Sequence, residues 1–336
     1  MRIGSHDTVR HVIVVAEIGN NHEGDFAVAR QLIDAAADAG VDAVKFQTAR
    51  ADLFISPADP DRRKRFASYE FSPAQWAELS AQARHRGLLF MSTPLDLVSL
   101  EMLTPLVDAV KIASGDVTFA PLLDAAAATR KPLVLSSGAA SLDEVAAAVT
   151  RVRGRWASLQ HAGELAVLHC VSAYPTPADE AQLRVIPTLV DRLGVTAGYS
   201  DHVAGIDAAV AAVALGARVI EKHFTLDKNY SAFRDHQLSA DPEDMRVLVE
   251  RVRAIEPMLG NAVKAIQPSE RANQPAIRRS IAAAADLPAG HVLGTADLIW
   301  IRPGTGLAPG QEHLLIGRAL VRGVRAGAQL SQSDVA

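Results

Sequence analysis

The alternation of short β-rich runs with longer helical stretches constrains the fold of this chain more than any other feature of its sequence. Eight such runs occur, and each is followed by a helical pattern. They span residues 12–18, 43–47, 88–92, 109–112, 133–136, 166–170, 195–200 and 219–224. Eight strands that alternate with helices are typical of a (β/α)8, or TIM, barrel. The sequence therefore predicts an α/β fold of this type.

The stretches between the runs carry the start and stop signals of helices. Asp25 can cap the first helix, and Gly40 can close it in the left-handed conformation. Ser141 and Glu144 have the spacing of a capping box ahead of a later helix. Residues 53–69 are too long and too polar for a plain turn. We expect them to form an ordered excursion over the carboxyl end of the barrel.

The composition changes after the eighth run. Residues 242–258 have the pattern of a closing helix, and Pro257, Gly260, Pro268 and Pro275 then interrupt the chain as in a linker. From about residue 279 short β-like pieces alternate with turns that contain proline and glycine. The sequence predicts a barrel domain at 1–256, a linker at 257–278 and a small β-rich domain at 279–336.

Charge and cysteine content limit the classes of function. A formal net charge of −4 over 336 residues argues against a nucleic-acid groove, which needs a basic face. Cys170 is the only cysteine, which excludes an intrachain disulfide and a thiolate zinc site. The first residues lack the apolar segment of a signal peptide, and no apolar stretch is long enough to span a bilayer. We expect a cytoplasmic protein with no nucleic-acid or membrane partner.

Histidines and lysines stand near the carboxyl ends of predicted strands, where barrel enzymes place their chemistry. Lys45 and Lys111 lie in the second and fourth runs, and His202 and His223 lie at the ends of the seventh and eighth. The last two runs are neighbours in a barrel, so these two imidazoles can bind one ion. Without thiolates, they suit manganese, zinc, iron or cobalt acting as a Lewis acid. Beside the lysines, such an ion would face a small anion.

The eighth run shows how side-chain alternation sorts these groups. Glu221 and His223 fall on one face of the strand, and Lys222 falls on the other. Less specific interpretations stay open, because a lone histidine is more often a satisfied core or surface residue, and a lysine is more often a solvated charge. Serines that end strands can simply form turns, but together they suit the lining of an anion site: Ser92, Ser114, Ser136 and Ser200.

Several motifs, met in order along the chain, resemble the sialic acid synthases. They are Ala-Glu-Ile-Gly-Asn-Asn-His-Glu-Gly-Asp at 16–25, Val-Lys-Phe-Gln-Thr at 44–48, Ser-Thr-Pro at 92–94, Lys-Ile-Ala-Ser-Gly-Asp at 111–116, Tyr-Pro-Thr-Pro at 174–177 and Ser-Asp-His at 200–202. Arg-Pro-Gly-Thr-Gly at 302–306 resembles the antifreeze-like SAF domain, a β-clip, that ends these enzymes. The resemblance covers nearly the whole chain.

The resemblance implies a transferase that condenses phosphoenolpyruvate with the open-chain aldehyde of an N-acylated hexosamine such as N-acetylmannosamine. Water addition and C–O cleavage then give a nonulosonic acid and phosphate. It also implies a divalent metal as cofactor, manganese in the first place, with magnesium, cobalt or zinc as alternatives.

The resemblance also implies roles for individual residues. His202 and His223 match the metal ligands, and Glu17 matches an acid that positions or protonates groups during the reaction. The phosphoenolpyruvate-binding positions are Lys45, Thr93, Lys111, Ser114, Ser136, Ser172 and Ser200. The sugar-binding positions are Asp116, Tyr174, Asp235 and Arg302. In the family, the SAF-domain arginine enters the partner subunit's site, which implies a domain-swapped homodimer.

Some positions depart from the family's pattern. Ser172 replaces an asparagine that helps hold phosphoenolpyruvate, and Phe119 stands where asparagine is common. Phe233 and Arg234 replace a Gly-Pro pair, and Asp116 stands where some members have glutamate. These changes fall mostly on the sugar side, so the acceptor is less defined than the chemistry. A phosphorylated, diacetamido or other aldehyde acceptor is an alternative.

Two other classes of function are compatible with a barrel of this kind. A Schiff-base aldolase would use Lys45, Lys111 or Lys222 as nucleophile and needs no metal. A non-catalytic sugar-binding protein would keep the fold and lose the chemistry. The presence of both histidines and both strand lysines argues against the second of these.

Overall fold

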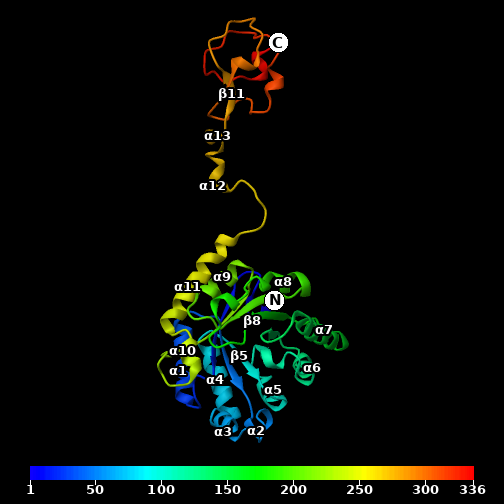
Figure 1. The fold of residues 1–336 in the computed structure, drawn as a ribbon, viewed down its shortest axis with the longest axis vertical. Coiled ribbons are helices and arrows are strands. Elements are labelled where there is room, and N and C mark those ends of the chain that lie inside the picture. The colour runs from blue at the N-terminus through cyan, green and yellow to red at the C-terminus, as the bar shows by residue number, and fades with distance from the viewer. The chain divides into compact units, whose positions relative to one another are not determined.

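The computed structural model describes residues 1–336 as two compact units, Met1–Gly260 and Asn261–Ala336. The first unit is a closed parallel barrel wrapped by helices (Figure 1). Its strands follow the order β10-β3-β4-β5-β6-β7-β8-β9 around the barrel. The strands are β3 Ile13–Gly19, β4 Ala43–Thr48, β5 Leu89–Pro94, β6 Ala109–Ile112, β7 Leu133–Ser136, β8 Leu165–Cys170, β9 Thr196–Asp201 and β10 Val219–His223. The predicted fold class and all eight strands are confirmed, with ends that shift by at most two residues.

Helices alternate with the strands and cover the outside of the barrel. They are α1 Phe26–Asp38, α4 Pro73–His85, α5 Leu97–Leu103, α6 Ala120–Ala128, α7 Leu142–Ser158, α8 Val185–Leu193, α9 Asp207–Ala214 and α11 Pro242–Leu259. The side chain of Asp25 caps α1, and Gly40 follows this helix with a φ of 83°. Ser141 and Glu144 form the expected capping box. No helix has the length and apolar character needed to cross a bilayer.

The barrel interior is divided along its axis. Near the amino ends of the strands it is apolar, with buried residues such as Ile13, Val15, Met91 and Leu168. A short hairpin of β1 Arg2–Ile3 and β2 His6–Asp7 adds Ile3 to this layer, an element the sequence did not predict. Toward the carboxyl ends the interior becomes polar. A larger apolar layer fills the space between the strands and the helices.

Residues 51–68 form the excursion predicted after the second barrel strand. It contains two helices, α2 Ala51–Phe54 and α3 Pro60–Ser68. Asp59 caps α3, and Pro60 occupies its first turn, a favourable start because proline fixes a helical φ. No residue of α3 is buried. Capping at its first turn therefore stabilises α3, and burial in a hydrophobic core does not.

The loop between β3 and α1 contains a buried histidine, His22. Its Nδ1 accepts a hydrogen bond from the backbone N–H of Gly24 at 3.0 Å, and its ring lies 4.6 Å from that of Phe71. Its Nε2 has no hydrogen-bond partner. Burial lowers the pKa of His22 to about 4, so the imidazole is neutral in the folded protein at pH 7.

We expect His22 to make the barrel sensitive to acid. Because its folded pKa lies below its unfolded value, its contribution to stability falls as the pH drops from about 6.5 to about 4. The loss amounts to roughly 3 kcal/mol. In His22→Gln the free energy of unfolding should fall less steeply across this range, as denaturant titrations at several pH values would show. Parallel curves for both proteins would contradict the expectation.

The second unit has a small core of its own. β11 Ser280–Ala283 and β12 Leu298–Ile301 pair antiparallel, and isolated bridges extend the β structure. Apolar residues gather around these strands: Ile281, Leu293, Leu298, Leu315, Leu320 and Leu330. Two one-turn helices, α12 Pro268–Arg271 and α13 Gln274–Ile277, lie within the segment predicted as a linker. The expectation of a small β-rich domain at the carboxyl end of the chain is confirmed.

Candidate active site

A polar cavity of about 380 Å³ opens where the barrel strands end at their carboxyl side. Twelve of the fourteen residues to which the family resemblance gave a role line it: Glu17, Lys45, Thr93, Lys111, Ser114, Asp116, Ser136, Ser172, Tyr174, Ser200, His202 and His223. The strand-end serine Ser92 was also expected at the anion site, but that prediction is wrong, because its side chain is buried within the barrel wall and its hydroxyl donates to the carbonyl of Phe46. Asp235 lies in an adjoining chamber, and Arg302 lies in the second unit. The topology thus brings together side chains from β3 to β10 and the loops that follow them.

Lys45 is the centre of a buried ion cluster. Its Nζ lies 2.7 Å from a carboxylate oxygen of Glu17 and 3.7 Å from Oε1 of Glu221, and it donates to the hydroxyl of Thr93 at 3.1 Å. Burial alone would lower the pKa of Lys45, but the two carboxylates outweigh burial and raise it. The ammonium group is therefore charged and already neutralised by the protein.

Lys111 has a different environment, although it is equally buried. Its Nζ donates to the hydroxyl of Ser136 at 2.6 Å and to the carbonyl of Ile112 at 3.0 Å, and it forms no ion pair. Burial lowers its pKa, while Glu221 acts in the opposite direction. Lys111 is thus a cation in the cavity that lacks an anionic contact, as expected of a group that receives an anionic ligand.

Glu221 belongs to the site but was not nominated from the sequence. It is buried, and its Oε1 accepts a hydrogen bond from the hydroxyl of Ser200 at 3.0 Å. Burial raises its pKa, but Lys111 and Lys45 outweigh burial and lower it, so it is ionised. For Glu17, by contrast, burial dominates and raises the pKa. The two carboxylates therefore differ in character, as in sites where one acts as an acid.

Two neighbouring strand ends place His202 and His223 with ring centroids 5.3 Å apart. Nδ1 of His202 lies 2.8 Å from the carbonyl of Val171, a contact that leaves Nε2 for another partner. Burial lowers the pKa of His202, but contacts with Cys170 and Val171 raise it overall. For His223, burial keeps the pKa well below its usual value, and its buried Nδ1 has no partner. No third His, Cys, Asp or Glu completes a metal cluster with them.

A glycine next to three of the lining residues leaves room for their polar groups. A Cβ added at Gly138 would lie 2.3 Å from Oγ of Ser172, 2.9 Å from Oγ of Ser114 and 3.2 Å from Sγ of Cys170. The N–H of Gly138 donates to the hydroxyl of Ser114 at 3.0 Å. Absence of a side chain therefore creates a small cradle beside Lys111 and the serines.

A wider chamber of about 900 Å³ adjoins the cavity, and Tyr174 and His223 line both. The ring of Tyr174 lies 4.2 Å from that of His202, and the guanidinium of Arg234 lies 5.1 Å above it. Arg234 pairs with Asp235 at 3.3 Å. Burial raises the pKa of Asp235 and of Asp116, which sits at the cavity's edge.

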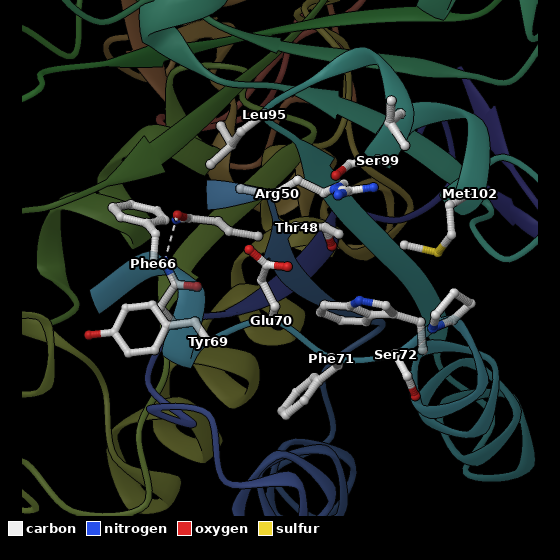
Figure 2. A pocket seen from close by; sticks show the side chains of 16 residues that line it. Thr48, Arg50, Phe66, Tyr69, Glu70, Phe71, Ser72, Leu95, Ser99 and Met102 are labelled. Carbon is white, nitrogen blue, oxygen red and sulfur yellow. Dashed lines mark hydrogen bonds between the residues drawn. The ribbon is translucent and has the colours of Figure 1, made fainter. Parts of the chain in front are cut away.

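The excursion contributes a third, mostly apolar cavity of about 450 Å³, shown in Figure 2. Phe66, Tyr69, Phe71, Leu95 and Met102 line it, together with polar residues such as Thr48 and Ser99. Phe66 of α3 lines all three cavities. Sequence reasoning predicted the excursion but did not identify the inward residues Phe54, Arg62 and Phe66, because no periodic pattern indicates which side chains of a short exposed helix face inward.

Lys222 does not line the polar cavity. Its ammonium group pairs with Asp201 at 2.9 Å and also donates to the carbonyl of Val203. Because Lys222 faces away from His223 along β10, it is not available as a nucleophile in the cavity. This placement agrees with the alternation predicted for the strand and removes one candidate of the aldolase alternative.

The fold and the cavity define a class: TIM-barrel enzymes with an active site at the carboxyl ends of their strands. Residues 32–264 match the NeuB family, and residues 278–336 match the SAF domain. The chain belongs to the NeuB family. The prediction of a synthase of this family with a C-terminal SAF domain is thereby confirmed, and the aldolase alternative is not favoured.

Relatives and solved structures are similar over most of the chain. An uncharacterized protein of Methanocaldococcus jannaschii is 41% identical and aligns over 91% of this chain and 89% of its own. The N,N'-diacetyllegionaminic acid synthase of Legionella pneumophila is 37% identical, over 94% and 92%. The structure of an N-acetylneuraminic acid synthetase from Leptospira borgpetersenii, in complex with citrate, has a TM-score of 0.73 at 34% identity, and covers 78% of this chain and 90% of its own.

Proposed function

We propose that this protein condenses phosphoenolpyruvate with the open-chain aldehyde of an N-acylated hexosamine and releases a nonulosonic acid and phosphate. The observation that supports this most directly is the cavity itself, where two buried lysines, a row of hydroxyls and two adjacent imidazoles converge in a NeuB-family chain. C3 of phosphoenolpyruvate forms the new bond to the aldehyde carbon. Water then adds to C2, and phosphate leaves with cleavage of the C–O bond.

Lys111 is the group best suited to the substrate's negative charge, because its own contacts are neutral. The hydroxyls of Ser114 and Ser172 lie at the cradle beside Gly138, and that of Ser136 contacts Lys111, so all three can add hydrogen bonds to phosphate or carboxylate oxygens. Ser172, although shorter than the family's asparagine, lies within this cradle. A buried cation with aligned hydroxyls binds an anion strongly because the site needs little reorganisation.

Glu17 is the proposed proton carrier at the reacting carbons. Burial raises its pKa, and Gln47 donates to its Oε1 at 3.0 Å, which fixes the carboxyl group. Lys45 is held between Glu17 and Glu221, so it stabilises whichever of the two carboxylates is ionised. A raised pKa suits a group that gives and takes a proton near neutral pH.

We propose that His202 and His223 hold a divalent metal, manganese in the first place. The residues fit such an ion, because one imidazole has its Nδ1 oriented by a carbonyl and the other has a buried nitrogen without a partner. With two protein ligands, the remaining coordination positions are left to water and substrate. When bound, the metal would act as a Lewis acid on the aldehyde oxygen.

The acceptor sugar is proposed to occupy the wider chamber beside Tyr174. Asp116 in the polar cavity and Asp235 in the chamber supply carboxyl groups for sugar hydroxyls, and Arg234 and Phe233 also line the chamber. The acceptor classes that we would compare are N-acetylmannosamine, its 6-phosphate and the 2,4-diacetamido hexoses.

Phosphate release from phosphoenolpyruvate tests the proposal directly. The purified protein with manganese should release phosphate with at least one of these acceptors, and EDTA should stop the reaction. Mass spectrometry should find the nine-carbon acid in equal amount. Phosphate release without an acceptor, or none with any of the three despite bound phosphoenolpyruvate, would overturn the assignment.

We further propose that Arg302 completes the site of a partner protomer in a domain-swapped homodimer. Arg302 directly follows β12, is exposed and forms no ion pair within its own unit. A guanidinium group can hydrogen-bond an N-acyl oxygen of the acceptor.

Mixing two weakly active variants tests the domain swap. Arg302→Ala and Lys111→Met alone should both be weakly active, the first through acceptor affinity. After they are unfolded and refolded together, about one quarter of the wild-type rate should return, because half of the dimers are mixed and each has one intact site. A rate no higher than the mean of the two variants would contradict the swap. Refolded wild-type protein serves as the control.

A further inference from the structure

The segment between β10 and α11 carries two groups of the acceptor side on an element outside the barrel sheet. Its short helix α10 Arg234–Leu238 presents Arg234 and Asp235 to the chamber beside Tyr174. The carboxylate of Asp235 pairs with the neighbouring Arg234 and forms no hydrogen bond with a strand. The positions of both groups therefore depend on how the backbone of α10 is held.

The β3–α1 loop holds α10 through a buried cluster. His236 is 1% exposed, with Nε2 at 3.0 Å from Oε1 of Glu23 and Nδ1 at 2.6 Å from Oγ1 of Thr225. The hydroxyl of Ser231 donates to the same oxygen of Glu23 at 2.6 Å. Glu23 thus binds the segment at two points, before and within α10.

A second contact secures the base of the segment. The side-chain amide of Asn21 donates to the carbonyl of Phe224 at 2.8 Å and to the hydroxyl of Ser239 at 3.1 Å. The hydroxyl of Ser239 in turn donates to the carbonyl of Asp235. These hydrogen bonds hold the two ends of the segment together without the help of His236. Loss of the contact between Glu23 and His236 should therefore displace α10 without unfolding the segment.

We infer that Glu23 and His236 are positioning residues, which fix α10 and so place Arg234 and Asp235 over the acceptor side of the site. This inference rests on the proposed function for its kinetic consequence. The groups assigned to phosphoenolpyruvate come from the strands and their loops and do not touch α10. The two halves of the site are therefore held by different parts of the chain.

Two variants of His236 separate this role from general packing. Glutamine can place an N–H near the position of Nε2 and keep the contact with Glu23, whereas asparagine reaches only the position of Nδ1, toward Thr225. His236→Asn should raise KM for the acceptor by roughly 10- to 100-fold, with KM for phosphoenolpyruvate within about twofold of wild type. His236→Gln should stay within about threefold of wild type for both substrates.

Either of two results would overturn the inference. Equal effects of the asparagine and glutamine variants would show that the Glu23 contact does not position α10. Parallel increases of KM for both substrates would show a general structural effect. Ser231→Ala, a milder change, should raise KM for the acceptor by about threefold, and it decides the question if the His236 variants do not fold. No change in that variant would then overturn the inference.

A control from the same segment is Lys228→Ala. Lys228 connects the segment to Asp241 and Asp244 through two ion pairs that are partly exposed to solvent. Exposed ion pairs contribute little, so both KM values should stay within about twofold of wild type.

Hydrogen exchange gives a readout that does not depend on the reaction. Backbone amides of residues 228–238 should exchange faster in His236→Asn than in wild type. In His236→Gln they should exchange at the wild-type rate. If wild type fails to turn over any acceptor, the proposed function fails, and hydrogen exchange still tests whether the contact between Glu23 and His236 holds α10. Identical exchange in all three proteins would overturn it.

Discussion

Replacement of His202 by alanine is expected to reduce turnover by more than about 10³-fold and to remove bound metal. The imidazole of His202 lies beside that of His223, and its Nδ1 contacts the carbonyl of Val171. Its Nε2 is therefore the atom that would bind the metal, and alanine removes it. Metal content of the purified variant, measured by elemental analysis, gives a readout besides activity. Phosphoenolpyruvate affinity, measured by calorimetry without metal, should change little.

His169 supplies a matched control for this substitution. It is also a buried histidine on a barrel strand, but it stacks on Tyr199 and binds the carbonyl of Ala181, away from the catalytic cavity. His169→Gln keeps a hydrogen-bond donor, so activity and metal content should stay close to wild type. If His202→Ala retained full activity and metal content, the proposed metal site would be wrong.

Replacement of Lys111 by methionine is expected to weaken phosphoenolpyruvate binding by roughly 10²- to 10³-fold, which corresponds to about 3–4 kcal/mol. The ammonium group forms no ion pair and its hydrogen-bond partners are neutral, so its loss removes a charge that is available to the substrate. Calorimetric titration with phosphoenolpyruvate measures the effect. An affinity within threefold of wild type would contradict the role of Lys111.

The same substitution should leave the fold at least as stable as before. Burial lowers the pKa of Lys111 in spite of the opposing effect of Glu221, so the buried ammonium costs more in desolvation than this attraction returns, and methionine has a similar length without the charge. We therefore expect an unchanged or higher melting temperature together with weak binding. Lys131→Met is the control, because Lys131 donates to the carbonyl of Val107 outside the catalytic cavity. That variant should bind phosphoenolpyruvate as wild type does.

The strands and the strand-end residues were predictable because local patterns define them. The β-rich runs located all eight barrel strands, and side-chain alternation along β10 was enough to separate Lys222 from His223. Capping residues such as Asp25 marked the helices equally well. Once the strands close into a barrel, their carboxyl ends must meet, so twelve nominated residues came to line one cavity.

The residues that were missed depend on contacts between distant parts of the chain. Glu221 was seen to share a face with His223, but its role as a partner of Lys45 requires the closed barrel. The pairing of Glu23 with His236 joins positions 213 residues apart, and no local pattern indicates it. The β1–β2 hairpin was missed because two strands of two residues are too short to leave a periodic signal.

The lack of any buried residue in α3 has an evolutionary consequence. Core packing restricts most substitutions in a barrel, but this helix has no core position to preserve, although Arg62 and Phe66 face the cavities. Mutations there can alter the shape and charge of the entrance with little loss of stability. Substrate range can therefore diverge in this excursion among descendants of one enzyme, while the chemistry at the strand ends stays unchanged.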